Sequence, residues 1–285
     1  MTATAGRIAR ALAKALGMSA AAPPTSSALA AFRGRRVLVC GASGNLGGHV
    51  ARRLARCGAH LVLWGRNAAA LEALAADCRA GSGTTVSTRS VDIADAAAAL
   101  AVLRQADDEA AFDCAFFVSG AGDTREAGRR FESAELVLTL GLVNYVAPSA
   151  LAAELGERMA ARGAGRIVLV GSAAAPHPLP FAAAYSSSKS GLSLFAESLR
   201  LAMKPHGVRV TLASPGFFSA AAGDAHTYAR PGEIRPDRVA ERIIEAAAAG
   251  KSEIVTPCWF MGLKWLGQVL PRPLRDRLLQ SLPSP

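Results

Sequence analysis

The chain has 285 residues, 51% of them hydrophobic, which is enough apolar material for one α/β core and marginal for two. Its formal net charge is +10, but the cations are spread along the sequence without an aromatic and basic recognition motif, so nucleic acid is not an expected partner. Attraction to phosphates or to an anionic lipid surface explains the charge better. No run of about 18 apolar residues predicts a transmembrane span.

Residues 1–33 form a predicted extension outside the core, in which a basic segment leads into a stretch rich in Pro, Ser and Ala. On a helical wheel, apolar and basic residues separate onto two faces: Ile8, Leu12 and Leu16 against Arg7, Arg10 and Lys14. An amphipathic surface helix, an organellar (mitochondrial) presequence and a disordered basic tail all fit this pattern. The segment lacks the apolar run of a secretory signal peptide.

A glycine-rich turn follows the first apolar strand, and a helix is predicted after it from His49 to Cys57. Such a turn points backbone N–H groups at a pyrophosphate, the helix dipole adds to the attraction, and glycine permits close backbone approach. The sequence therefore predicts a dinucleotide site on the residues of this turn: Gly41, Ser43, Gly44, Asn45, Leu46 and Gly47.

The end of the second predicted strand, His60 to Asn67, indicates which dinucleotide binds. A site selective for NAD places an acidic residue here to bind the ribose hydroxyls, but this chain has Gly65. Arg66 follows, and its guanidinium can pair with a 2′-phosphate. The sequence therefore favours NADP(H) over NAD(H).

A serine, a tyrosine and a lysine stand in a spacing that predicts proton transfer. Gly165 to Gly171 reads as a strand that ends at Ser172, and a predicted helix from Ala183 to Arg200 holds Tyr185 and Lys189 one turn apart. A nearby ammonium would lower the phenol pKa from its ordinary value of about 10 toward the working pH. Ser172 would then hold a carbonyl oxygen.

This order of glycine turn, serine, tyrosine and lysine strongly resembles the short-chain dehydrogenase/reductase family, from about Gly34 to about Pro257. Alternating apolar strands and alanine-rich helices predict a parallel sheet covered on both faces. The resemblance implies a single Rossmann-type doubly wound sheet of about seven strands in residues 34–257, and a homodimer or homotetramer.

The resemblance also implies a catalytic tetrad of Asn144, Ser172, Tyr185 and Lys189. In reduction, Tyr185 gives the proton to the carbonyl and Ser172 hydrogen-bonds its oxygen. Lys189 lowers the tyrosine pKa and binds the nicotinamide ribose, and Asn144 holds a water of the proton relay.

Further cofactor contacts are implied in three segments. They are Asp92 and Ile93 beside the adenine, Gly120, Ala121 and Gly122 at the ribose, and Pro215, Gly216 and Phe218 at the nicotinamide carboxamide. The family pattern is altered at several positions. Cys40 replaces a threonine, Asn45 stands for the second glycine of the turn, and Ser119 and Gly120 replace two asparagines that brace the sheet. We expect Asn45 to keep the turn because asparagine tolerates a left-handed backbone.

The segments after the tetrad are less informative. Residues 220–236, small and polar, are expected to cover the substrate. Residues 258–285 combine tryptophans, leucines and cations, which is typical of membrane-interface elements and equally of tails that pack over their own pocket or a partner subunit. The five cysteines and five histidines show no metal-ligand spacing, and reduced thiols in a reducing compartment fit best.

We therefore predict a cytoplasmic NADP(H)-dependent oxidoreductase that passes hydride between the nicotinamide and a small-molecule carbonyl or secondary alcohol. One alternative is a ketolipid or sterol reductase at a membrane surface, contacted through the tails. The other is a non-catalytic NADP-binding regulator or scaffold, which the altered asparagine segment makes conceivable.

Overall fold

The computed structural model describes residues 30–122, 129–218, 232–262 and 269–281. Most of the predicted N-terminal extension and of the segment expected to cover the substrate lie outside this part of the chain. The strands are β1 (Arg36–Cys40), β2 (His60–Gly65), β3 (Val86–Ser90), β4 (Cys114–Phe117), β5 (Gly165–Val170), β6 (Val208–Pro215) and β7 (Glu253–Thr256).

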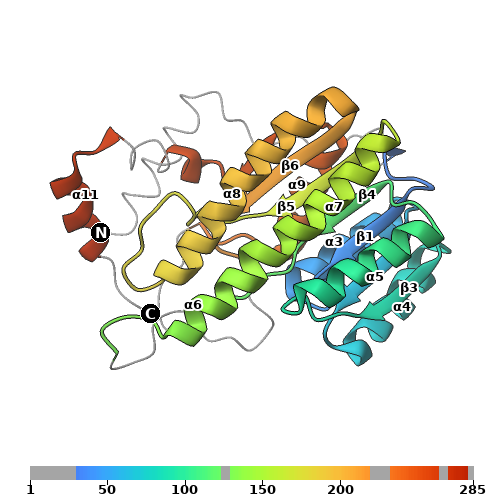
Figure 1. Ribbon diagram of the computed structural model, residues 1–285, viewed down its shortest axis with the longest axis horizontal. Helices are drawn as coiled ribbons and strands as arrows, with labels where there is room; N and C mark the ends of the chain where they lie inside the picture. The colour runs from blue at the N-terminus through green and yellow to red at the C-terminus, as the bar shows by residue number, and fades with distance from the viewer. Residues whose placement is uncertain (1–29, 123–128, 219–231, 263–268, 282–285) are drawn as a thin grey trace.

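Helices alternate with these strands along the chain (Figure 1). They are α3 (Asn45–Arg56), α4 (Ala68–Ser82), α5 (Ala96–Glu109), α6 (Ala134–Gly141), the π-turn η1 (Leu142–Val146), α7 (Ala147–Ala161), α8 (Ala183–Met203), the 3-10 turn η2 (Lys204–His206), α9 (Pro236–Ala248) and α11 (Arg272–Gln280).

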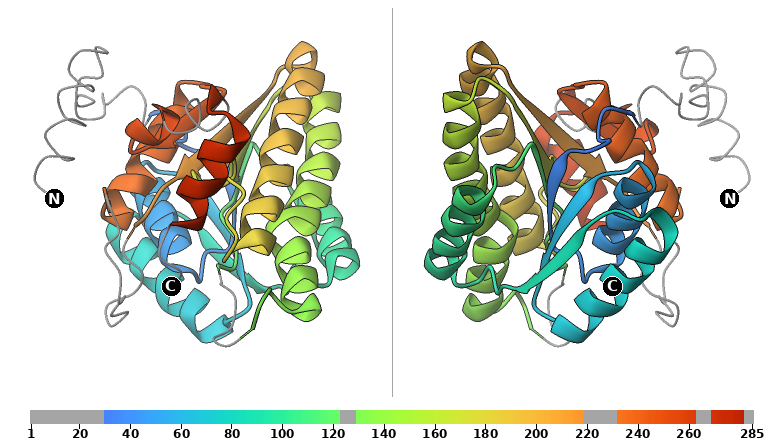
Figure 2. Two further views of the ribbon diagram at one scale, coloured as in Figure 1. Left: turned by 90° about the vertical axis from the view of Figure 1, so that its left-hand side faces the viewer. Right: turned by 90° about the vertical axis from the view of Figure 1, so that its right-hand side faces the viewer.

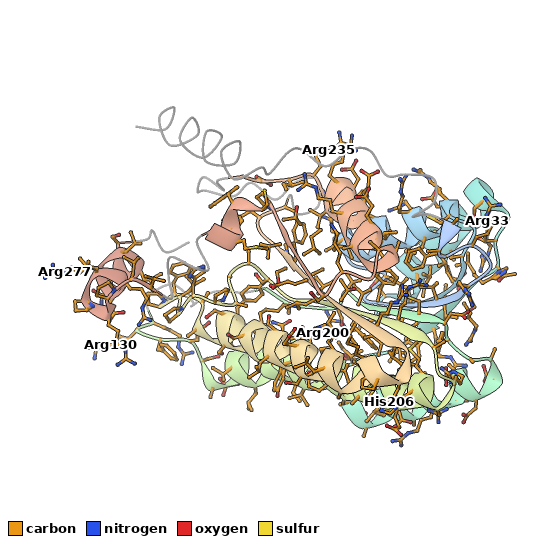
Figure 3. The ribbon with its side chains drawn as sticks, turned by 90° about the horizontal axis from the view of Figure 1, so that it is seen from above. Arg33, Arg130, Arg200, His206, Arg235 and Arg277 are labelled. Carbon is orange, nitrogen blue, oxygen red and sulfur yellow. The ribbon has the colours of Figure 1, made fainter. Side chains whose placement is uncertain are left out.

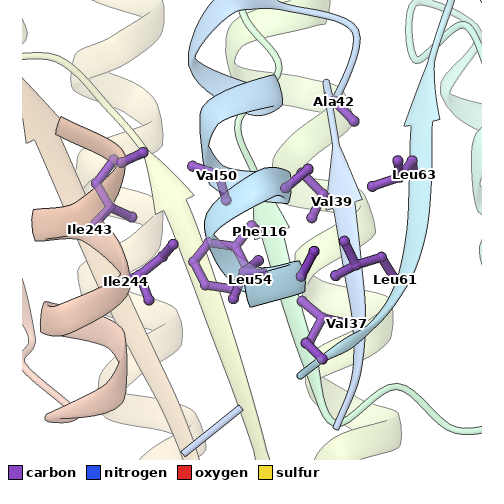
Figure 4. Packing of buried hydrophobic residues seen from close by; sticks show 14 of the residues in the cluster. Val37, Val39, Ala42, Val50, Leu54, Leu61, Leu63, Phe116, Ile243 and Ile244 are labelled. Carbon is purple, nitrogen blue, oxygen red and sulfur yellow. The ribbon is translucent and has the colours of Figure 1, made fainter. Parts of the chain in front are cut away.

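The seven strands form one parallel sheet in the order β3-β2-β1-β4-β5-β6-β7. Helices cover both of its faces, as the two side views in Figure 2 show. One apolar core joins α3, α4 and α9 to the sheet, and a second joins α5, α7 and α8 to its other face. Figure 4 shows the first core, where Leu54 and Ile244 meet Phe116. The predicted doubly wound sheet is confirmed.

The apolar core includes a residue that lies ahead of β1. Phe32, assigned to the extension, is fully buried and packs its ring against Phe116 at a centroid distance of 5.9 Å. The guanidinium of Arg166 lies over the same Phe32 ring, 5.9 Å from its centroid. Apolar burial of this kind stabilises by about 2 kcal/mol for a large side chain, so Phe32 contributes to the stability of the sheet domain.

One helix among the described residues, the continuous run 134–161 formed by α6, η1 and α7, is long and apolar enough to cross a membrane. Three of its side chains, Leu151, Leu155 and Met159, are fully buried in the second core. Burial against the sheet therefore explains the apolar residues of α7, whereas only 39% of the apolar window as a whole is buried.

Candidate active site

The predicted site residues gather at one edge of the sheet, where the parallel strands end. The strand order reverses direction between β1 and β4, and ligands of doubly wound sheets bind at such a switch point. Gly41 follows β1 and Ser119 follows β4, and the backbone N–H groups of Val118 and Ser119 both donate to the Cys40 carbonyl. The two turns are therefore joined at the centre of the site.

The glycine turn has no space for side chains at two positions. Gly41 has a φ of +90°, and a Cβ on it would lie 2.5 Å from the Ser119 nitrogen. A Cβ on Gly47 would lie 2.1 Å from the Gly41 oxygen. Gly44 precedes α3 with extended backbone, and no side chain caps the helix, which is the arrangement of an anion-binding helix N-terminus.

Two details of this turn differ from the prediction. Helix α3 begins at Asn45, not at His49, so Asn45 has helical backbone. None of the described non-glycine residues has a positive φ, and the left-handed reversal falls on Gly41 instead. The expected left-handed role of Asn45 was therefore wrong, because the helix starts one turn earlier. Leu46 turns into the core, where it is 6% exposed.

Ser43, Gly65 and Arg66 form the predicted ribose end of the nucleotide site. A Cβ on Gly65 would lie 2.4 Å from the Ser43 hydroxyl oxygen, so an acidic side chain does not fit there unless Ser43 moves. Ser43 and Arg66 are exposed. The Ser90 hydroxyl donates to the Arg66 carbonyl at 3.1 Å, which fixes the loop that carries the guanidinium.

Asp92 and Ile93 lie just after β3, beside this end of the site. Asp92 is exposed, and its carboxylate accepts the Ala94 N–H at 3.0 Å, while Ile93 is buried. The Val91 N–H donates to the Gly65 carbonyl at 3.0 Å, which links this segment to the end of β2. The placement is compatible with the predicted adenine contact.

Asn144 lies in the π-turn η1 and is fully buried. Its Oδ1 accepts the Ala121 N–H at 2.8 Å, and its Nδ2 donates to the Ala121 oxygen at 2.9 Å and to the Ser188 hydroxyl at 3.2 Å. Both amide hydrogens are thus used within the protein. The side chain ties the turn after β4 to α8, and a relay water would have to bind it through Oδ1.

Lys189 is buried against the same turn. Its Nζ donates to the Val170 carbonyl at 2.9 Å, and burial lowers its pKa to about 8. A Cβ on Gly120 would lie 3.1 Å from this Nζ and 3.2 Å from the Asn144 Oδ1. The glycine that replaces the family's second asparagine therefore leaves the space that both side chains border.

Tyr185 completes the group together with Ser172. The Ser172 hydroxyl hydrogen-bonds the phenol, and a Cβ on Gly122 would lie 3.8 Å from the tyrosine ring. Burial raises the pKa of Tyr185, and the Ser172 hydrogen bond opposes that rise only in part. The expected lowering of this pKa by Lys189 is not seen, because burial dominates and shifts the lysine pKa as well.

The Pro215–Gly216 turn ends β6 beside Ser172. The Ala173 N–H donates to the Pro215 carbonyl at 2.9 Å, and the Gly216 N–H donates to the Thr256 carbonyl at 2.8 Å. Phe218 pairs with Ile234 in an isolated bridge. The segment predicted to hold the nicotinamide carboxamide thus directly borders Ser172, the predicted catalytic serine.

One functional candidate, Glu132, was missed in the sequence. It is 7% exposed, and its Oε2 accepts the Ala184 N–H at 2.9 Å, one residue before Tyr185. Helix α8 has no side-chain cap of its own at Ala182. A carboxylate from 52 residues away therefore caps the helix that carries Tyr185 and Lys189. Its other oxygen is buried and finds no hydrogen-bond partner among the described residues.

Two altered family positions contact each other. The Cys40 thiol donates to the Ser119 hydroxyl at 3.9 Å, so a weak contact stands where the family pattern has threonine and asparagine. Burial raises the pKa of Cys40 to about 12. All five cysteines are free, and in the described part of the chain no three His, Cys, Asp or Glu side chains are grouped to hold a metal ion.

The sheet order, the glycine turn and the grouped side chains define a nucleotide-dependent oxidoreductase of the Rossmann type. A family model for the short chain dehydrogenases matches residues 35–229, more than half of the chain. The chain is 32% identical over 249 residues to an uncharacterized oxidoreductase of Myxococcus xanthus, covering 87% of this chain and 97% of that protein. It therefore belongs to the short-chain dehydrogenase family.

Other relatives agree. Dehydrogenase/reductase SDR family member 7B of Bos taurus is 30% identical over 239 residues, which cover 77% of this chain and 72% of that protein. The short-chain dehydrogenase of Sphingobium yanoikuyae, solved in complex with NADPH, superposes with a TM-score of 0.72 at 26% identity, covering 87% of this chain and 96% of the other. A ketone-specific alcohol dehydrogenase of Comamonas testosteroni shares the fold, with a TM-score of 0.71 at 22% identity and coverage of 87% and 95%.

Proposed function

We propose that the protein is an NADP(H)-dependent oxidoreductase that transfers hydride between the nicotinamide and a carbonyl or secondary alcohol. The observation that carries the proposal is the grouping of Asn144, Ser172, Tyr185 and Lys189 around the turn after β4, beside the glycine turn. The NADPH bound to the Sphingobium relative supports the choice of nucleotide. So do the missing carboxylate at Gly65 and the exposed Arg66.

In this proposal each side chain has one task during reduction. The bound nicotinamide supplies the hydride. Tyr185 donates its phenolic proton to the carbonyl oxygen, and the Ser172 hydroxyl hydrogen-bonds that oxygen. Lys189 binds the nicotinamide ribose, and Asn144 holds the turn after β4 and a relay water. A raised pKa keeps Tyr185 protonated at neutral pH, which is the form that reduction requires.

The test measures NADPH and NADH oxidation with short, acyl-chain, steroid and sphingoid ketones, together with direct nucleotide titration. We expect turnover with NADPH, and we expect Tyr185→Phe to lower kcat about a thousandfold while the NADPH Kd is kept. Tyr145→Phe is the matched control, because this tyrosine is 38% exposed next to Asn144 and loses the same hydroxyl. Tight NADPH binding without turnover on any ketone would favour the non-catalytic regulator.

A second candidate function, reduction of a ketolipid or sterol at a membrane surface, is favoured by helix α11. This helix has no buried residue, and it exposes Leu274 and Leu278 beside the cations Arg272 and Arg277. It lies at the end of the molecule opposite β3 and α4 (Figure 1), and Figure 3 shows Arg277 at the same end as Arg130. Amphipathic cationic helices bind anionic bilayers.

Sedimentation with vesicles of anionic and of neutral lipid tests this candidate. We expect the full chain to sediment with anionic vesicles and the double variant Leu274→Ser/Leu278→Ser to remain in solution. Equal sedimentation of both proteins would exclude α11 as the contact. If the protein does not bind vesicles, we propose that it is a cytoplasmic enzyme.

Self-association is a further part of the proposal, because members of the family are commonly oligomeric. Apolar side chains remain exposed on adjoining helices: Val137 and Leu138 on α6, Tyr145 and Val146 on η1, and Leu194 and Leu201 on α8. Leu194 is 70% exposed, and contiguous exposed apolar patches mark protein–protein interfaces. We expect a homodimer by light scattering, and a monomer for Leu194→Arg.

A further inference from the structure

The C-terminal segment that follows β7 returns to the Pro215–Gly216 turn. The Phe260 ring lies on Gly216 so closely that a Cβ there would be 2.4 Å from its Cε2 and 2.9 Å from its Cδ2. Trp259 stacks on Phe260 with a centroid distance of 3.9 Å and an angle of 23°. Phe217 meets the same phenylalanine ring edge-on at 6.2 Å. Three aromatic rings therefore pack together beside this turn, and one of them, Phe260, lies directly on Gly216.

Trp259 also packs against Gly232, which lies shortly before α9 in the chain. Gly232 has a φ of +73°, and a Cβ on it would lie 2.8 Å from the indole Nε1. The Ile234 N–H donates to the Phe217 carbonyl at 3.0 Å, and Phe218 bridges Ile234. Phe260 therefore packs on Gly216 and Trp259 packs on Gly232, and backbone pairing of Phe217 and Phe218 with Ile234 joins the two segments that carry these glycines.

This contact is not part of either apolar core. Trp259 and Phe260 are only partly buried, and neither belongs to the two buried clusters that join the helices to the sheet. Their packing is instead concentrated on the turn whose Pro215 carbonyl accepts the N–H of Ala173, the neighbour of Ser172. Loss of the ring should therefore disturb the turn more than the global fold.

We propose that Phe260, backed by Trp259, is a positioning residue of the nucleotide site: it holds the Pro215–Gly216 turn in place and through it the nicotinamide. The inference rests on the proposed function and deepens it, because it makes the C-terminal segment a working part of the reduction site. Gly216 is the complementary half of the contact, since any side chain there would enter the space of the ring.

The decisive experiment is a double-mutant cycle read by NADPH titration and by thermal unfolding. Gly216→Ala should raise the NADPH Kd roughly tenfold, because its new methyl group displaces the Phe260 ring and the turn. Phe260→Ala should raise it about threefold, because the turn loses its support. The double variant should bind better than Gly216→Ala alone, because the methyl group then enters the space left by the ring. Met261→Ala, at an exposed neighbour, is the control.

A purely structural role makes different predictions. It would lower the melting temperature of Phe260→Ala and leave unchanged both the NADPH Kd and the deuterium isotope effect measured with 4-deuterated NADPH. A positioning role changes the Kd and the isotope effect, and Phe260→Leu restores part of both. Effects of Gly216→Ala and Phe260→Ala that simply multiply in the double variant would overturn the inference.

The outcomes also separate this inference from the proposed function. If the unaltered protein binds NADPH and the cycle shows no coupling, the inference fails and the proposed function stands. If it binds NADPH without turning over any ketone, the cycle still decides the inference. If it binds neither NADPH nor NADH, both fail together.

Discussion

The two halves of the site are built in different ways. On the β1–β3 side, called the glycine half below, the site consists mainly of backbone: a Cβ on Gly41 or Gly47 would clash with backbone atoms, and one on Gly65 would require Ser43 to move. On the β4–β6 side, it consists of buried polar side chains, with Asn144 and Lys189 hydrogen-bonded to carbonyls of the sheet and its turns. Substitutions outside the glycines, such as Cys40, are therefore tolerated in the first half. The second half depends on the identity of each side chain.

The largest effect should come from adding a side chain at a crowded glycine of the glycine half. Gly47→Ala places a methyl group 2.1 Å from the Gly41 oxygen, so the turn must open, and we expect a loss of NADPH affinity of roughly a hundredfold. Gly44→Ala is the matched control, since its Cβ would be 3.2 Å from the same oxygen and its backbone is extended. Titration of both variants should differ by at least an order of magnitude. Equal affinities would contradict the steric account.

In the side-chain half, Lys189 should make stability depend on pH. Burial places its pKa at about 8, below the ordinary 10.5, so between these values the folded protein binds fewer protons than the unfolded chain. Its stability should therefore rise with pH across this window, by up to about 1.4 kcal/mol per pH unit.

Urea unfolding at pH 8 and pH 9.5 measures the contribution of Lys189 to this pH dependence, as the difference in unfolding free energy between the unaltered protein and Lys189→Met. Lys204→Met, an exposed lysine at the end of α8, serves as the control. A difference between the unaltered protein and Lys189→Met that does not grow with pH would show that the ammonium is not buried in solution.

Much of the fold could be predicted because its signals are local. Apolar strands that alternate with amphipathic helices indicate the doubly wound sheet, and the tyrosine and lysine one turn apart share a helix face in any context. The glycine turn is local too, although the start of α3 was misplaced by one turn. The contacts within each motif are fixed by a few consecutive residues.

The residues that hold the motifs together could not be predicted, because they come from distant parts of the chain. Glu132 and Glu135 are the same residue type three positions apart, yet Glu132 is buried against the start of α8 and Glu135 is exposed. Phe260 belongs to a tail whose composition suits a membrane equally well. The raised pKa of Tyr185 depends on how many neighbours exclude water, and spacing does not contain that information.

The cap on α8 offers a smaller test of the side-chain half. Glu132→Ala should lower the free energy of unfolding by about 1.5 kcal/mol, because the Ala184 N–H loses its acceptor, and it should lower kcat by loosening the start of the Tyr185 helix. Glu132→Gln keeps an acceptor oxygen and should retain most of both. Glu157→Ala, at an exposed glutamate of α7, is the control and should change neither. If Glu132→Ala and Glu132→Gln have the same unfolding free energy and the same kcat, the Glu132 carboxylate does not stabilise α8 as a cap.

The smallest effect is expected at the rim of the glycine half, where we propose that the Arg66 side chain distinguishes NADPH from NADH. Arg66 is exposed, so its pairing with a 2′-phosphate is screened, and Arg66→Ala should raise the NADPH Kd only about fivefold, near 1 kcal/mol. The NADH Kd should not change, because NADH lacks that phosphate. Arg56→Ala, an exposed arginine at the far end of α3, controls for the lost positive charge. If Arg66→Ala weakens both nucleotides equally, Arg66 supports the loop after β2, and selectivity comes from the missing carboxylate at Gly65.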